Sequence, residues 1–243
     1  MHYIPYLSTL VTLVFAIAVF RRYLLRRGPY LLLWTIGLLW FGVGTLGEIL
    51  LGLTFSGLVL KLWYLSGAML TAAWLGQGTV HLLVRRQGVA WSLTGLLTAV
   101  SVLAAVLVLL APLSAAASSY QVSQPISSQY QDFLTRSGLV IVLTIVLNIY
   151  GSLTLIGGAV YSAWIFWRKH VLFNRMIGNI LIAVGAFAPA LGGSFVRIGL
   201  PDFLYLTELV GSVLMFIGFL QSTARTAVEA GPSSSREPSE DRP

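Results

Sequence analysis

The stretch that decides the fold runs from Pro29 to Val84 and reads PYLLLWTIGLLWFGVGTLGEILLGLTFSGLVLKLWYLSGAMLTAAWLGQGTVHLLV. Its only Asp, Glu, Lys or Arg residues are Glu48 and Lys61. A single helix of this length would be roughly twice the thickness of a bilayer. The stretch therefore predicts two membrane-spanning helices that are joined by a tight turn at Thr54-Phe55-Ser56.

Five further apolar runs surround this hairpin, each near the ~20 residues that a helix needs to cross the hydrocarbon. The seven runs cover residues 4–20, 29–53, 57–84, 88–113, 137–167, 176–196 and 203–221. Only 9% of the chain is Asp, Glu, Lys or Arg and 57% is hydrophobic, which leaves too little polar surface for a soluble domain. We expect residues 1–221 to form an all-α integral membrane bundle of seven transmembrane helices, surrounded by the lipid bilayer of the cell membrane.

Several classes of chemistry are excluded by composition. The chain has no Cys, so it has no disulfide, no thiolate nucleophile and no Cys-type metal site. The net charge is +7, but the basic residues lie in short clusters between apolar runs, so we expect no nucleic-acid partner. The seventh run has no Lys to bind retinal, and we find no catalytic carboxylate pair at the membrane face and no His-rich metal pattern. We expect no cofactor, no metal and no enzyme.

The distribution of Lys and Arg predicts the orientation. A cleaved signal peptide ending at Ala16-Ile17-Ala18 is the alternative for the first run, but Met1 to Tyr6 lacks the positive charge that such a peptide carries. With a retained first helix and the N-terminus outside, only Lys61, Arg136 and Arg197 lie outside. The positive-inside bias then places the other twelve in the cytoplasm: Arg21, Arg22, Arg26, Arg27, Arg85, Arg86, Arg168, Lys169, Arg175, Arg225, Arg236 and Arg242.

Two segments are not membrane-spanning. Residues 114–135 are rich in Ser and Gln and form the longest outer loop, either a lid over an outer pocket or a flexible connection. Residues 222–243 have a composition that cannot bury a core, so we expect a disordered cytoplasmic tail, too short for an output domain.

Charged residues gather in the outer third of the predicted bundle, and ionisable groups in a membrane cost ~2.5–3.5 kcal/mol each on insertion scales. Two interpretations are open. Glu48 pairs with Lys61 across the hairpin while the others reach the headgroups, or Glu48, Lys61 and Glu208 line an outward-facing pocket for a ligand or ion. Candidates for ligand binding at this end are Glu48, Lys61, Tyr64, Arg197 and Glu208. Trp63 and Tyr64 beside them are typical of interface anchors.

Deeper polar residues are few: Gln77, His81, Asn148 and Asn179. His81 has no neighbouring carboxylate on its helix, so we expect hydrogen bonds between helices from His81, Asn148 and Asn179 rather than a metal site. The frequent glycines indicate close helix packing, and Pro189 predicts a kink in the sixth helix.

Part of the sequence resembles a known family. Leu46-Gly47-Glu48, the run from Lys61 to Gly67, then Trp74 and Arg85-Arg86 resemble the seven-helix sensor module at the N-terminus of some bacterial histidine kinases and cyclases. The resemblance implies that Glu48, Lys61, Tyr64 and Trp74 carry the module's characteristic positions; Pro189, Asp202, Thr207 and Glu208 fit more loosely. It also implies a sensor that binds a small ligand from the outer side. Since no kinase or cyclase domain follows in this sequence, we expect it to act through a cytoplasmic signalling partner or a second copy of itself.

A small-molecule transporter is the competing class. The first three and last three helices run in the same directions, which permits a three-plus-one-plus-three repeat. Leu46-Gly47 and Leu191-Gly192 are 145 residues apart in the sequence. Gly67 and Gly211 are separated by nearly the same number of residues. Carriers of the PQ-loop type share this size and orientation, although no Pro-Gln pair occurs in these helices. A structural or assembly subunit of a membrane complex is the third class.

The orientation is testable with reporter fusions. We expect a reporter that is active only outside the cytoplasm to work when fused at Tyr120, and a reporter that is active only in the cytoplasm to work at Gln221, because of the asymmetry in Lys and Arg. The opposite pattern of activity would invert the topology.

Overall fold

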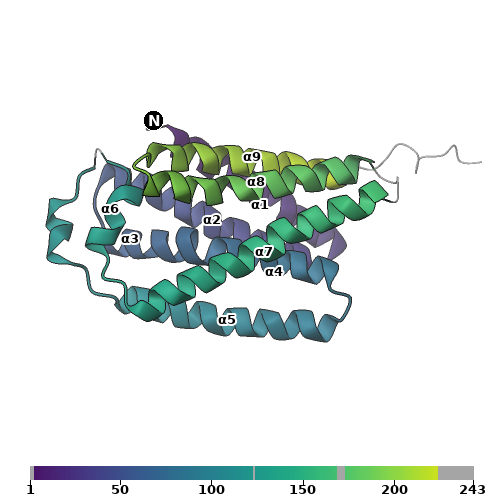
Figure 1. Ribbon diagram of the computed structural model, residues 1–243, viewed down its shortest axis with the longest axis horizontal. Helices are drawn as coiled ribbons and strands as arrows, with labels where there is room; N and C mark the ends of the chain where they lie inside the picture. Colours follow the sequence, from purple (N-terminus) through teal and green to yellow (C-terminus); the bar gives the residue numbers. More distant parts are fainter. Residues whose placement is uncertain (1–2, 123, 169–172, 224–243) are drawn as a thin grey trace, which may run out of the picture.

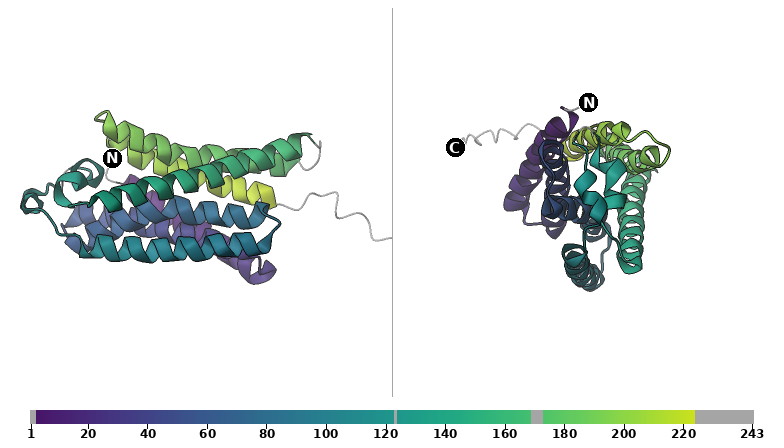
Figure 2. Two further views of the ribbon diagram at one scale, coloured as in Figure 1. Left: turned by 60° about the horizontal axis from the view of Figure 1, so that its bottom comes forward. Right: turned by 90° about the vertical axis from the view of Figure 1, so that its left-hand side faces the viewer.

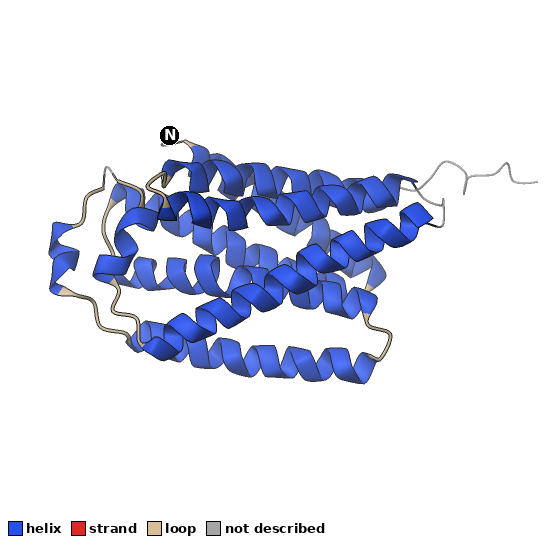
Figure 3. Ribbon diagram, viewed as in Figure 1, coloured by secondary structure: helices blue, strands red, loops and turns tan. Residues whose placement is uncertain are grey.

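The computed structural model describes residues 3–122, 124–168 and 173–223, and this part of the chain consists of helices and loops without a strand (Figure 3). Seven helical segments are long and apolar enough to cross a membrane. They are α1 (Ile4–Arg26), α2 (Pro29–Leu53), the composite segment Gly57–Leu83, α5 (Gln87–Leu110), α7 (Gly138–Arg168), α8 (Phe173–Arg197) and α9 (Asp202–Thr223). The prediction of an all-α seven-helix bundle is confirmed, and the protein is a multi-pass membrane protein.

The bounds of these helices differ from the predicted runs at a few ends. Helix α1 continues to Arg26 instead of ending at residue 20, so several of its basic residues belong to the helix. Helix α5 ends at Leu110 instead of residue 113. Ser222 and Thr223 continue α9. The rest of the predicted tail, 224–243, and Lys169 lie outside the described residues.

Six of the seven segments form a closed ring. Around the ring, α1 packs against α2, α2 against α4 (Thr71–Leu83), α4 against α7, α7 against α8, α8 against α9, and α9 returns to α1. Helix α5 lies outside the ring, against α4 and α7 (Figure 2). The first three segments therefore occupy places in the ring that correspond to those of the last three.

The two ends of the bundle differ in charge. One end, which we call the basic end, carries the described Arg residues of the predicted cytoplasmic side: Arg21, Arg22, Arg26, Arg27, Arg85, Arg86, Arg168 and Arg175. The other end carries the start of α1, the α2–α3 and α8–α9 turns, and the long connection between α5 and α7 (Figure 1). In the predicted orientation this second end faces outside.

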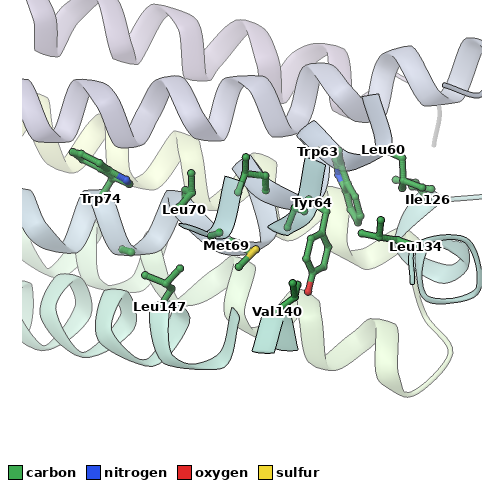
Figure 4. Close-up of a cluster of buried hydrophobic side chains, with 14 of the residues drawn as sticks. Leu60, Trp63, Tyr64, Met69, Leu70, Trp74, Ile126, Leu134, Val140 and Leu147 are labelled. Atoms are coloured by element: carbon green, nitrogen blue, oxygen red, sulfur yellow. The ribbon is translucent and has the colours of Figure 1, made fainter. Parts of the chain in front are cut away.

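That long connection is a folded lid. It contains the 3-10 helix η2 (Ala115–Ser119) and helix α6 (Ile126–Phe133). The backbone N–H of Ser114 donates to the carbonyl of Phe133 at 2.9 Å, which ties the start of the lid to its end. Ile126 and Leu134 are buried and lie beside Leu60 at the end of the bundle (Figure 4). The described part of this segment packs against the bundle, and we call residues 112–135 the lid and this end of the bundle the lid end.

The third membrane segment is not a uniform α-helix. Helix α3 (Gly57–Trp63) passes into the π-helical turn η1 (Tyr64–Leu70) before α4 begins. The backbone N–H of Thr71 and its hydroxyl both donate to the carbonyl of Ser66, the hydroxyl at 2.9 Å. A π-turn adds one residue to the helical repeat, so the faces of α3 and α4 are rotated relative to each other. Such turns are frequent at functional sites.

Helices α8 and α9 approach to backbone contact. A Cβ added to Gly185 would lie 2.7 Å from the carbonyl oxygen of Gly211, and one added to Gly218 would lie 2.9 Å from the nitrogen of Ile182. No side chain fits between backbones at such distances, which is how small residues let membrane helices associate. The close-packing role predicted for the glycines is found here, whereas Gly157 and Gly193 face open space.

This contact predicts that a Gly→Ala change lowers stability at one position of α8 and does not lower it at another. Gly185→Ala should lower the free energy of unfolding by about 1–3 kcal/mol, because the new methyl group forces the two backbones apart. Gly193→Ala has open space around its Cβ and should leave stability unchanged or raise it by up to about 1 kcal/mol. Thermal unfolding of the purified variants in detergent measures both. Equal effects of the two changes would contradict the proposed contact.

Candidate functional site

Two carboxyl groups meet beneath the lid. Glu48 lies near the end of α2 and Glu208 lies about 9 Å along α9 from its start at Asp202, so both are within the membrane-spanning segments. Glu48 is only 6% exposed, and its carboxyl group lies next to that of Glu208. The indole N–H of Trp63 donates to Oε1 of Glu48 at 3.2 Å. The Oε2 atoms of both glutamates are buried and have no hydrogen-bond partner.

Glycines on α2 bring Trp63 to this carboxyl group. A Cβ on Gly47 would lie 3.0 Å from the Cβ of Trp63, and a Cβ on Gly44 would lie 3.0 Å from the Cα of Gly67. Gly44, Gly47 and Glu48 lie on one buried face of α2, which is the spacing of a helix face. Larger residues at these two positions would separate α3 from α2 and break the indole contact.

The lid rests on both helices that carry the carboxyl groups. The Tyr120 hydroxyl donates to the carbonyl of Leu51, one turn beyond Glu48 on α2, at 2.8 Å. Burial raises the pKa of the Tyr120 phenol, so it stays protonated and keeps donating through the neutral range. On α9, the buried Tyr205 lies one turn before Glu208, and its hydroxyl contacts the backbone of Ile126 in α6. The two lid contacts therefore sit directly above the two glutamates.

The predicted pair of Glu48 with Lys61 is wrong. The Lys61 ammonium donates to the carbonyl of Leu109 on α5 at 2.9 Å, outside the ring. Lys61 and Trp63 are two residues apart on α3, which separates them by ~200° around the helix. Since Trp63 faces α2, Lys61 faces away from it. Position along a hairpin does not fix the direction of a side chain.

The aromatic residues at the start of the third segment are not interface anchors. Trp63 is 7% and Tyr64 1% exposed, and both side chains lie in a buried cluster (Figure 4). Both rings contact Tyr130 of α6. The hydroxyl of Tyr64 shares a hydrogen bond of 2.9 Å with Thr144 of α7, so it is already occupied. The guanidinium of Arg136 lies 5.0 Å from the centre of the Tyr130 ring. These residues hold the lid, and of them Trp63 also bonds the carboxyl group of Glu48.

A separate polar network lies toward the basic end. Gln77, fully buried on α4, donates to Thr94 of α5 at 2.8 Å and accepts a hydrogen bond from Tyr150 of α7. Nε2 of His81 lies 2.8 Å from the same Thr94 hydroxyl, which itself donates to the carbonyl of Ala90. This leaves Nε2 as the donor and Nδ1 buried without a partner. The network joins three helices and fixes α5 to the ring.

The predicted hydrogen bonds between helices are confirmed for His81 and Asn148, and wrong for Asn179. The Asn148 amide donates to the carbonyl of Ala68 in η1 at 2.7 Å. The Asn179 amide instead donates to Arg175 in its own helix. Sequence reasoning missed Thr94 and Tyr150, because hydroxyl groups in apolar helices usually bond their own backbone and carry no pattern that identifies a partner.

An open groove of about 630 Å³ lies at the lid end, between α6 and the α8–α9 turn. Amide and hydroxyl groups and one carboxylate line it, together with small apolar surfaces: Gln124, Pro125, Ser127, Ser128, Gln131, Asp132, Val196, Gly199 and Pro201. Ser127 is 3% exposed, and its hydroxyl has no hydrogen-bond partner. Arg197 ends α8 next to this groove, but its side chain lies outside the described part of the structure.

Among the described residues, no group of three or more His, Cys, Asp or Glu is arranged to hold a metal ion. The arrangement at the lid end thus consists of a polar groove, the lid that forms one of its walls, and a carboxyl pair beneath the lid. Fold and site together define a multi-pass membrane protein with a folded lid over one end of a six-helix ring. Comparison of the chain with protein-family models, with curated proteins and with solved structures gives no match.

The geometry at Glu48 predicts which neighbour it depends on. In a double-mutant cycle for stability, Glu48→Met and Trp63→Phe should show a coupling of about 0.5–3 kcal/mol, because the two side chains share a buried hydrogen bond. Glu48→Met and Lys61→Met should be additive within about 0.5 kcal/mol. Thermal or denaturant unfolding in detergent gives both values. A larger coupling of Glu48 to Lys61 than to Trp63 would instead support an ion pair between Glu48 and Lys61.

Proposed function

We propose that this protein is a receptor-like membrane module that binds a small polar ligand from the outer side, in the groove at the lid end, and acts through a partner. One observation carries the proposal: the groove wall contains a buried hydroxyl, that of Ser127, which has no partner within the protein. A buried polar group without a hydrogen bond costs about 1–3 kcal/mol. A ligand hydroxyl or amide at this position would recover that energy.

The lining favours an uncharged or weakly cationic ligand that is rich in hydrogen-bonding groups. Gln124, Gln131 and Ser128 both donate and accept, and Asp132 supplies the groove's carboxylate. Val196 and Pro201 give the groove an apolar floor on the α8–α9 side. Sugars, polyols and amino acids have this combination of polar edges and small apolar faces.

A response to the ligand has a path through the bundle. The lid contacts α2 through Tyr120 and α9 through Tyr205, so a shift of α6 acts on both helices. Helix α9 runs from the lid to the basic end, where the guanidinium of Arg22 donates to the carbonyl of Thr223 at 3.3 Å. The basic end is the surface on which a cytoplasmic partner, or a second copy of the chain, would detect this change.

Thermal unfolding in detergent with a panel of sugars, polyols and amino acids tests the groove. We expect one of these classes to raise the melting temperature, and Ser127→Val to weaken that ligand's affinity roughly 3- to 10-fold through the loss of one hydrogen bond. Ser118→Val, in the exposed part of the lid away from the groove lining, is the matched control and should not change the affinity. Binding that is indifferent to Ser127→Val would place the ligand elsewhere.

A transporter is the second candidate, and the ring favours it. Gly44 of α2 contacts Gly67 of the third segment, and Gly185 of α8 contacts Gly211 of α9, at corresponding places in the two halves of the ring. Helix α5 stands alone outside, as the connecting helix of a three-plus-one-plus-three repeat would. Uptake of a radiolabelled ligand from the panel into proteoliposomes separates the two candidates. Accumulation identifies a transporter, and binding without uptake identifies a receptor.

A further inference from the structure

The carboxyl pair beneath the lid holds no positive partner among the side chains that the structure places around it. Trp63 from α3 supplies an indole N–H and Tyr205 from α9 a phenol, and the lid reaches Tyr205 through Ile126 and Tyr120. The described basic groups of this end point elsewhere. The Lys61 ammonium is bound to a carbonyl of α5, and the Arg136 guanidinium lies over the rings of Tyr64 and Tyr130.

The donors and acceptors of the two carboxyl groups show how many protons the pair holds when its members are in contact. An ionised carboxylate only accepts hydrogen bonds, so two of them in contact repel each other and cannot bond. A carboxyl group that carries a proton can donate to the other. One negative charge then remains, and the N–H of Trp63 stabilises it. Burial of a single charge that has a donor costs far less than burial of two that face each other.

We propose that Glu48 and Glu208 form a proton-binding site that holds one proton between α2 and α9, and that loss of this proton releases the lid. The site lies outside the groove, and its proton is measured without a ligand in the groove.

The coupling to the lid follows from spacing along the two helices. Leu51, which accepts the hydrogen bond of Tyr120, is three residues after Glu48. Tyr205, which contacts the lid at Ile126, is three residues before Glu208. Each lid contact is therefore one helical turn above one carboxyl group, on the same face. When the proton leaves, repulsion between the two carboxylates separates α2 from α9 and pulls the two lid contacts apart.

Infrared spectroscopy of the protein in nanodiscs tests the proton directly, through the carbonyl stretch of a protonated carboxylic acid. We expect the wild-type protein to show one such band at pH 7, where exposed carboxyl groups are ionised. Glu48→Gln and Glu208→Gln should each remove it, since an amide donates to the remaining carboxylate without a proton. Asp202→Asn, at an exposed carboxyl group on the same end of α9, is the matched control and should keep it.

A cysteine label tests the coupling to the lid, because the chain has no native Cys. Ser127→Cys places a thiol at a buried position of the lid, and Ser118→Cys places one at an exposed position as the control for the pH dependence of the thiol itself. The ratio of their modification rates should rise several-fold over the pH range in which the infrared band disappears. In the Glu48→Gln background this ratio should stay constant across the same range.

Several results would overturn the proposal. A wild-type protein without a protonated acid at pH 7 excludes the shared proton, whether or not the variants fold. A band that NaCl abolishes and choline chloride does not identifies a sodium ion as the occupant. A thiol ratio that stays flat while the band disappears removes the coupling to the lid. None of these outcomes changes the shift in melting temperature by which the groove is tested, so the two proposals fail separately.

Discussion

Hydrocarbon offers no hydrogen-bond partner to a polar group, and this constraint governs the bundle at every level. It forces the backbone into helices at each crossing. It also requires each polar side chain within the membrane to find a partner on a neighbouring helix or on its own backbone. The few polar residues of this chain therefore connect neighbouring helices through hydrogen bonds. Thr9 bonds Thr45 between α1 and α2 at 2.8 Å, and Asn148 bonds η1 from α7.

The membrane crossings of this structure could be predicted from the sequence, whereas the directions of its polar side chains could not. The seven crossings follow from the length and spacing of apolar runs, and the structure contains all seven. Depth was also accessible, since it depends only on the number of residues from a turn. The direction of a side chain was not. Lys61 and Glu48 both lie near the turn at residues 54–56, but the rotation of α3 that brings Trp63 to Glu48 turns Lys61 toward α5.

The neighbours of each helix were equally hidden. Glu208 lies far from Glu48 in sequence, and nothing in either apolar run indicates that α9 closes the ring against α1 and brings Glu208 to Glu48. The π-turn at Tyr64–Leu70 adds a second obstacle, because it rotates the faces of α4 relative to a regular helix. Helix α6 was missed because it has only eight residues and most of them are polar. Such a short helix depends on the contacts of its buried side chains with the bundle.

The lid, the ring and the carboxyl pair form one mechanical unit. Within the ring, α9 packs along α8 and α1, and at the lid end the side chains of Glu48 and Glu208 bring α9 to α2. The lid lies over this place and is held by contacts with the same two helices, through Tyr120 to α2 and through Tyr205 of α9. In the proposed switch, an event that changes the distance between α2 and α9 moves the lid, and an event that moves the lid acts on the two carboxyl groups. Such reciprocity is a thermodynamic requirement when two sites share one structural element. It gives a groove at the surface and a buried acid pair a physical reason to respond to each other.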